Sequence, residues 1–192
     1  MRKAARSANQ STDQFPNYAL AFYHVCIMDA ARSAVAAFLE YGEVIDDEGG
    51  GDAESAARFL QNALTYCGVI SRYFWPAKSR PIETHRAKLL RKHFHVEDDS
   101  ALHSRKLRND LEHFDEKIDA WIMEFPVGPI VVSPIIGSHL LVDDGFGHAF
   151  KIIDTREEIY VVLGKKHAFG SIAKEVARLV SDYEFNGSKS AK

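Results

Sequence analysis

Cysteine is scarce in this chain. The 192 residues include two cysteines, Cys26 and Cys67, and neither belongs to a Cys-x-x-Cys pair. This scarcity argues against a small disulfide-stapled protein, and the spacing matches no recognised zinc pattern. Both cysteines lie in apolar segments with helical spacing, so we expect small buried side chains of the kind found in proteins of a reducing cytoplasm.

Excess positive charge and long apolar runs are also lacking. The formal net charge is -3, which gives no support to a general nucleic-acid coat protein and leaves a local basic patch open. The most apolar stretch, Tyr18 to Tyr41, contains Asp29 and Arg32 and is too polar to span a membrane. The polar, basic N-terminus has no apolar segment behind it and does not fit a secretory signal. We therefore expect a cytoplasmic protein without a membrane partner.

Helical periodicity, by contrast, is abundant. Hydrophobic residues make up 46% of the chain, enough for the core of one domain. In five segments they recur every three or four positions, as on one face of an amphipathic helix. The sequence predicts helices over residues 17–41, 53–73, 83–94, 101–125 and 171–183.

The residue pattern changes from helical to strand-like after Pro126. Short β-branched segments follow, and "HAFKIID" and "EEIYVVLG" flank Thr155 and Arg156 in the manner of a β-hairpin. We predict a mainly α fold, an antiparallel four- or five-helix bundle with a small β-hairpin element inserted before the last helix. The expected domain covers residues 14–185, with the β element at about 130–164 and disordered tails at 1–13 and 186–192.

The segment "RNDLEH" carries the candidate chemistry of the chain. It places Arg108 and Asn109 in front of His113. At 100° per residue, Asn109 and His113 lie one turn apart on the same face, whereas Arg108 and His113 diverge by roughly 140°. One reacting atom could meet both Arg108 and His113 only with help from a second helix, or from a second copy of this helix across a two-fold axis.

At these residues the sequence resembles the HEPN superfamily, whose motif is Arg, a polar residue, three variable residues and His. Many members are helical-bundle, metal-independent endoribonucleases in which the motifs of two protomers line one cleft. The resemblance implies a homodimer that cleaves RNA without a cofactor, as a toxin or defence component that has a cognate antitoxin. His113 would transfer a proton, Arg108 would bind phosphate, and Asn109 would orient the imidazole or bind phosphate. The β-hairpin departs from the basic family pattern.

Two features leave alternatives open. The helix predicted at 83–94 is basic and would form the RNA-binding wall through Arg86, Lys88, Arg91 and Lys92, or would be a solubilising face. Carboxylates crowd the motif and would repel RNA, and they are Asp110, Glu112, Asp115, Glu116 and Asp119. The competing interpretation is a non-catalytic helical dimer that acts as a binding or regulatory module. No histidine spacing indicates a metal site.

Overall fold

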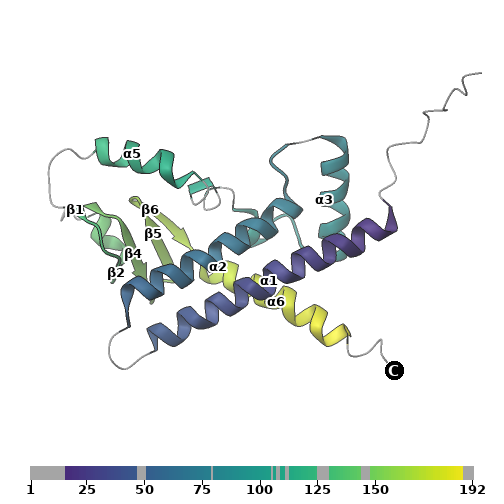
Figure 1. Cartoon of the computed structure of the whole chain (residues 1–192), viewed down its shortest axis with the longest axis horizontal. Helices are drawn as coiled ribbons and strands as arrows, with labels where there is room; N and C mark the ends of the chain where they lie inside the picture. The colour runs from purple at the N-terminus through teal and green to yellow at the C-terminus, as the bar shows by residue number, and fades with distance from the viewer. Residues whose placement is uncertain are drawn as a thin grey trace, which may run out of the picture.

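The chain is mainly helical, with small strands gathered at one end (Figure 1). The computed structural model describes residues 16–46, 51–78, 80–104, 106, 109–110, 113–124, 130–143 and 148–187. The predicted mainly α fold with a small β element before the last helix is confirmed at this level. The predicted tail 1–13 lies outside the described residues, as do residues 188–192.

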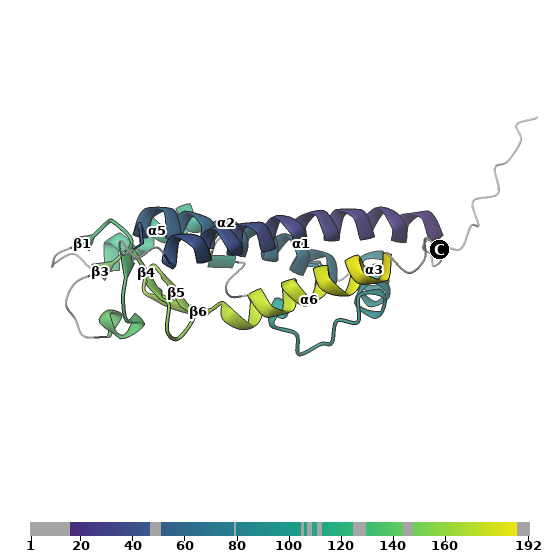
Figure 2. The same cartoon turned by 90° about the horizontal axis from the view of Figure 1, so that it is seen from below.

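Two long helices form the centre of the molecule. α1 (Asn17–Ile45) and α2 (Ala53–Phe74) lie side by side, and α2 runs back along α1 (Figures 1 and 2). Their contact is lined with small side chains that allow close approach, namely Ala30, Ala31, Ala34, Ala56 and Ala57. Asp52 begins α2 by accepting hydrogen bonds from the N–H groups of Glu54 (3.1 Å) and Ser55 (3.2 Å).

Two further helices pack against this pair, α3 against α2 and α6 against α1. α3 (Pro81–His93) lies at the end of α2 away from the strands, and α6 (Gly170–Gly187) runs beneath α1 (Figure 2). Phe94, which follows α3, is fully buried and stacks on the His24 ring at 5.2 Å. α6 is longer than the predicted helix 171–183 and extends into the predicted C-terminal tail.

The β element is larger than the predicted hairpin. β1 (Ile130–Val131) pairs in parallel with β3 (His148–Ala149). A second sheet has the order β2 (Ile135–Ile136), β4 (Lys151–Asp154), β5 (Ile159–Val162) and β6 (Lys165–Ala168). β5 is antiparallel to both β4 and β6, whereas β2 is parallel to β4. β6 lies beyond the predicted range 130–164, because its short basic sequence carries no strand pattern of its own.

The single helix predicted over residues 101–125 is wrong in its extent. The structure has a short 3₁₀ helix, η1 (Ala101–His103), and then α5 (Phe114–Glu124). Between them Lys106, Asn109 and Asp110 are helical. The chain leaves η1 at Ser104, which is extended. The His103 ring stacks on Trp75 at 4.5 Å and Leu102 is buried, so tertiary contacts hold η1 apart from α5.

α1 is long and apolar enough, by length and composition alone, to cross a membrane. Its inner face, however, fills the protein core with Ile27, Ala31 and Ala34. Core helices of many proteins pass the same test of length and composition. The absence of a membrane partner stays a prediction.

A buried carboxylate joins the β4–β5 turn to the short helix η2 (His139–Val142). Asp154 accepts hydrogen bonds from the backbone N–H and the ring Nδ1 of His139 at 3.0 and 2.8 Å. Its other oxygen accepts from the N–H groups of Arg156 and Glu157, both at 3.1 Å. These bonds, that of the His139 N–H foremost, hold the pKa of Asp154 at about 2, below its usual 3.8.

We predict that Asp154→Ala lowers the free energy of unfolding at neutral pH. The folded pKa of Asp154 lies below the unfolded one, so its stabilisation is present above about pH 4 and is lost as the pH falls towards about 2. Urea unfolding across this range should therefore show a weaker acid dependence in the variant. Asp143→Ala, which removes an exposed pair with Lys166, is the control and should change little. An unchanged acid dependence in Asp154→Ala would contradict the assignment.

Candidate functional site

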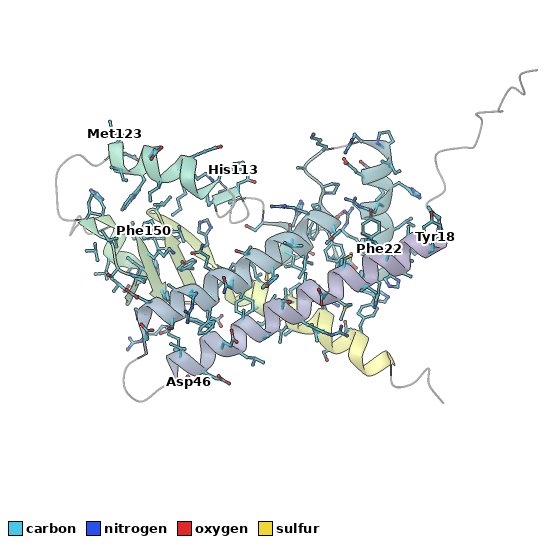
Figure 3. The ribbon with its side chains drawn as sticks, viewed as in Figure 1. Tyr18, Phe22, Asp46, His113, Met123 and Phe150 are labelled. Atoms are coloured by element: carbon cyan, nitrogen blue, oxygen red, sulfur yellow. The ribbon has the colours of Figure 1, made fainter. Side chains whose placement is uncertain are left out.

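The motif lies in the segment that leads into α5. His113 is in the turn directly before α5 and its side chain is 55% exposed, with Nδ1 at 3.6 Å from Oε2 of Glu116 (Figure 3). Asn109 is exposed, and its carbonyl oxygen accepts hydrogen bonds from the His113 N–H (3.2 Å) and from Lys117 Nζ (2.7 Å). Arg108 lies outside the described residues. The imidazole of His113 is therefore open to a ligand and has a carboxylate beside it.

Asp110, at the centre of the motif, is buried rather than solvated. One carboxylate oxygen accepts hydrogen bonds from Lys117 Nζ and from Lys165 Nζ, the latter at 3.3 Å. The other oxygen lies 3.4 Å from Nε2 of His167. Because Lys165 and His167 belong to β6, this carboxylate ties the motif segment to the edge of the sheet.

The charges around Asp110 do not balance. Burial by itself raises the pKa of Asp110, but hydrogen bonds from Lys117 and Lys165 outweigh it and keep the pKa below its usual value. Burial lowers the pKa of His167, and Asp110 opposes this only in part, so His167 is neutral near pH 7. Its Nε2 has no hydrogen-bond partner within the described part of the chain. Two ammonium groups thus share one carboxylate, which leaves a net positive charge beside Asn109.

A small pocket opens between α5 and the sheet next to this cluster. Its volume is about 120 Å³, and Trp121 and Leu163 form its apolar part, while Lys117, Lys165 and Glu124 supply charges. The ring of Trp121 is fixed by contact with the Phe150 ring at 6.2 Å. The motif segment therefore borders a hollow whose lining includes two lysines, Lys117 and Lys165, and two carboxylates, Asp110 and Glu124.

The predicted RNA-binding wall on α3 divides into two kinds of residue. Arg86 lies over the Tyr23 ring at 5.2 Å, and Arg91 donates to the carbonyl of Phe74 at 2.5 Å. Both guanidinium groups therefore support packing between helices. Lys88 and Lys92 are exposed. Of the four residues predicted to bind RNA, these two have side chains directed at solvent.

The carboxylates expected to repel RNA are also of two kinds. Asp110 is neutralised by its lysine partners, whereas Glu116 and Asp119 are exposed. Glu112 lies outside the described residues. Sequence reasoning missed the partners of Asp110. Lys117 lies on the following helix, seven residues after Asp110, and this helical spacing could have identified it. Lys165 and His167 come close to Asp110 only because β6 packs beside the motif segment.

No group of three or more His, Cys, Asp or Glu side chains that could hold a metal is found among the described residues. Comparison with known proteins identifies no relative, since no family model, curated protein or solved structure matches this chain. The resemblance to the HEPN superfamily is therefore carried by "RNDLEH" and by the place of this segment late in a helical chain.

We predict that Asp110→Ala loosens the motif segment without unfolding the protein. The change leaves Lys117 and Lys165 without their shared acceptor, which should cost about 1–3 kcal/mol of stability. Hydrogen–deuterium exchange should rise in Asn109 and α5 and stay constant in α1 and α2. Asp119→Ala, an exposed carboxylate on α5, is the matched control. Equal hydrogen–deuterium exchange in Asp110→Ala and Asp119→Ala would show that the contacts of Asp110 with β6 do not stabilise the motif segment.

Proposed function

We propose that this protein is a HEPN-like, metal-independent endoribonuclease. The observation that carries the proposal is the inward turn of Asp110. Its pairing with Lys117 and Lys165 buries one carboxylate of the motif and gathers cationic groups beside Asn109, while Glu116 stays exposed beside His113. A phosphate approaching the motif on the side of Asn109 then meets two ammonium groups, on a chain whose overall charge is negative.

The proposed reaction uses RNA as its own nucleophile. The 2′-hydroxyl attacks the adjacent phosphorus, a new P–O bond forms, and the bond to the 5′-oxygen of the next nucleotide breaks. The proton of the 2′-hydroxyl passes to a base, and the leaving 5′-oxygen receives one. His113 performs one of these proton transfers, because an imidazole can both accept and donate a proton and this ring is accessible. The products are a 2′,3′-cyclic phosphate and a 5′-hydroxyl.

Charge stabilisation falls to the cationic neighbours. Arg108 is proposed to bind the scissile phosphate, and Asn109 to orient the imidazole or to donate to a phosphate oxygen. Lys165, whose side chain is 57% exposed, is close enough to the motif to bind a neighbouring phosphate. The reaction proposed here uses no metal and no cofactor.

The proposal includes an antiparallel helical bundle and a homodimer, as the HEPN resemblance implies. It also places the chain in the cytoplasm as a toxin or defence component, with a cognate antitoxin as partner. Support for the bundle comes from α1 and α2, which lie side by side in both views, and from α6, which crosses and contacts α1 (Figures 1 and 2). In the proteins that it resembles, a second copy supplies the facing motif.

A second candidate is a non-catalytic helical dimer that acts as a binding or regulatory module. It is favoured by large apolar side chains that α1 leaves in solvent. Tyr18 is 79% exposed and Phe22 is 67% exposed, and both lie near the N-terminal end of α1 (Figure 3). Exposed apolar side chains that gather on one face indicate a docking surface.

We predict that the purified protein cleaves RNA in the presence of EDTA and that His113→Ala abolishes the cleavage. Removal of a general acid–base group usually costs about 10²–10⁴ in rate. Arg108→Ala should have a comparable effect if Arg108 binds the scissile phosphate. The measurement is a gel assay on several structured and unstructured RNAs, with the cyclic phosphate identified by mass spectrometry.

The matched control for the cleavage assay is His85→Ala, which removes an exposed histidine from α3. Its activity should equal that of the wild type. Cleavage that survives both His113→Ala and Arg108→Ala would rule out the proposed site. An absence of cleavage across all RNAs would favour the second candidate.

We predict that Lys165→Ala weakens RNA binding and that Lys166→Ala does not. The two lysines are neighbours on β6, but Lys165 pairs with Asp110, whereas Lys166 pairs with Asp143, away from the motif. Loss of one phosphate contact should reduce the salt dependence of binding by about one unit of log–log slope. Binding to a non-cleaved RNA analogue would be measured at several salt concentrations. A larger effect of Lys88→Ala and Lys92→Ala would instead assign binding to α3.

A further inference from the structure

Two histidine rings face each other where α1, α3 and α6 meet. His24 lies near the start of α1, and His93 is the last residue of α3. Nδ1 of His24 is 3.1 Å from Nε2 of His93, and both rings are half-buried. This separation of the two nitrogens is a hydrogen-bond distance. Neither histidine is part of the motif, so the pair calls for a role of its own.

Aromatic rings enclose the histidine pair and bring α6 to it. The His24 ring stacks on Phe94 at 5.2 Å and meets the Tyr183 ring of α6 edge-on at 5.1 Å. The Tyr183 hydroxyl also donates a hydrogen bond to the backbone carbonyl oxygen of His93. The end of α6 is therefore seated on α1 and α3 through these two histidines, and the three helices lie together at this end of the molecule (Figure 2).

The hydrogen bond between the rings survives the binding of one proton but not of two. In the neutral pair, one of the facing nitrogens donates and the other accepts. A first added proton leaves a charged donor that faces a lone pair. A second proton places an N–H on both facing nitrogens. The bond is then lost, and two positive charges face each other across 3.1 Å.

We propose that His24 and His93 form an acid-sensitive latch, which holds the end of α6 against α1 and α3 at neutral pH and opens when both rings are protonated. Opening separates the two imidazoles, lets water reach them, and removes the surface on which the Tyr183 ring is seated. The latch does not rest on the proposed ribonuclease, because none of its residues belongs to the motif, to α5 or to β6.

The groups around the pair oppose the second proton. Burial lowers the pKa of His24, and the charge of Arg32 on α1 lowers it further. Burial also lowers the pKa of His93, and His24 and His95 add to this effect. Burial raises the pKa of Tyr183, so the phenol that α6 brings to the pair carries no charge. The closed latch is therefore the form that holds fewer protons.

The pH at which the latch weakens follows from these directions. Both folded pKa values lie below the ordinary histidine value of 6.5, so the folded chain binds fewer protons than the unfolded chain in mildly acidic solution. The stabilisation is complete above about pH 6.5 and is lost as the pH falls below it. Because the rings are coupled, the two protons bind in two steps that belong to the pair. Asp154, with a pKa of about 2, responds in a more acidic range.

Contacts that do not titrate in this range limit the opening to the last turns of α6. The guanidinium of Arg86 lies over the Tyr23 ring at 5.2 Å and keeps α3 on α1. Arg178, in the middle of α6, donates to the carbonyl oxygen of His95 at 3.3 Å and pairs with Asp182 at 2.7 Å. Acid should therefore free the part of α6 around Tyr183 while the rest of the helix stays in place.

The test is an NMR titration of the full chain through mildly acidic pH. The ring resonances of His24 and His93 should both titrate with midpoints below 6.5, the ordinary value. The nuclear Overhauser contacts between the His24 and Tyr183 rings, whose centres lie 5.1 Å apart at neutral pH, should be lost as the second proton binds.

His93→Gln is the decisive variant, because glutamine keeps a hydrogen-bonding group but binds no proton. Its contact between His24 and Tyr183 should persist at the acidic pH that opens the wild type. His85→Gln, which removes an exposed histidine of α3, is the matched control and should open like the wild type.

Three results would overturn the latch. The first is a pair whose midpoints both lie at or above 6.5. The second is a contact between His24 and Tyr183 that persists in the wild type after both rings are protonated. The third is a folded His93→Gln variant that loses this contact at the same pH as the wild type. If His93→Gln does not fold, the wild-type titration alone decides.

Discussion

The side chain of Asp110 determines how the motif meets solvent. A carboxylate at this position would repel phosphate if it faced outward, and the sequence gives no local reason for it to turn inward. It turns inward because its partners Lys117, Lys165 and His167 lie on the inner side. Lys165 and His167 belong to β6. The same contacts attach α5 to the sheet and form the wall of the adjacent pocket. One buried charge thus links the β element to the chemistry of a segment 55 residues earlier in the chain.

The long helices could be predicted from the sequence because their determinants are local. In α2 the apolar residues repeat along one face, Asp52 caps the start, and the buried positions are those of the repeat. The 101–125 prediction failed for the opposite reason. Its periodicity is helical throughout, but η1 is fixed by the contact of His103 with Trp75, which lies in another part of the chain. A stacking contact of this kind overrides periodicity and leaves no trace in a local pattern.

Only the part of the candidate site formed by residues close together in the sequence could be predicted. The one-turn spacing of Asn109 and His113 is a property of any helix, and their backbone hydrogen bond retains it. Strand pairing is non-local, so nothing near Lys165 or His167 indicated that β6 would reach the motif. The basic helix misled in the same way. Arg86 and Arg91 appear as free charges in the sequence, yet each is committed to a neighbouring aromatic ring or carbonyl.

α1 and α5 together explain why one chain supports two hypotheses. The inner face of α1 is rich in alanine, which allows α2 to approach closely, so the apolar residues that a helix normally buries are partly displaced to its outer face. Because α2 separates this surface from the motif, the two proposed functions concern different sides of the molecule.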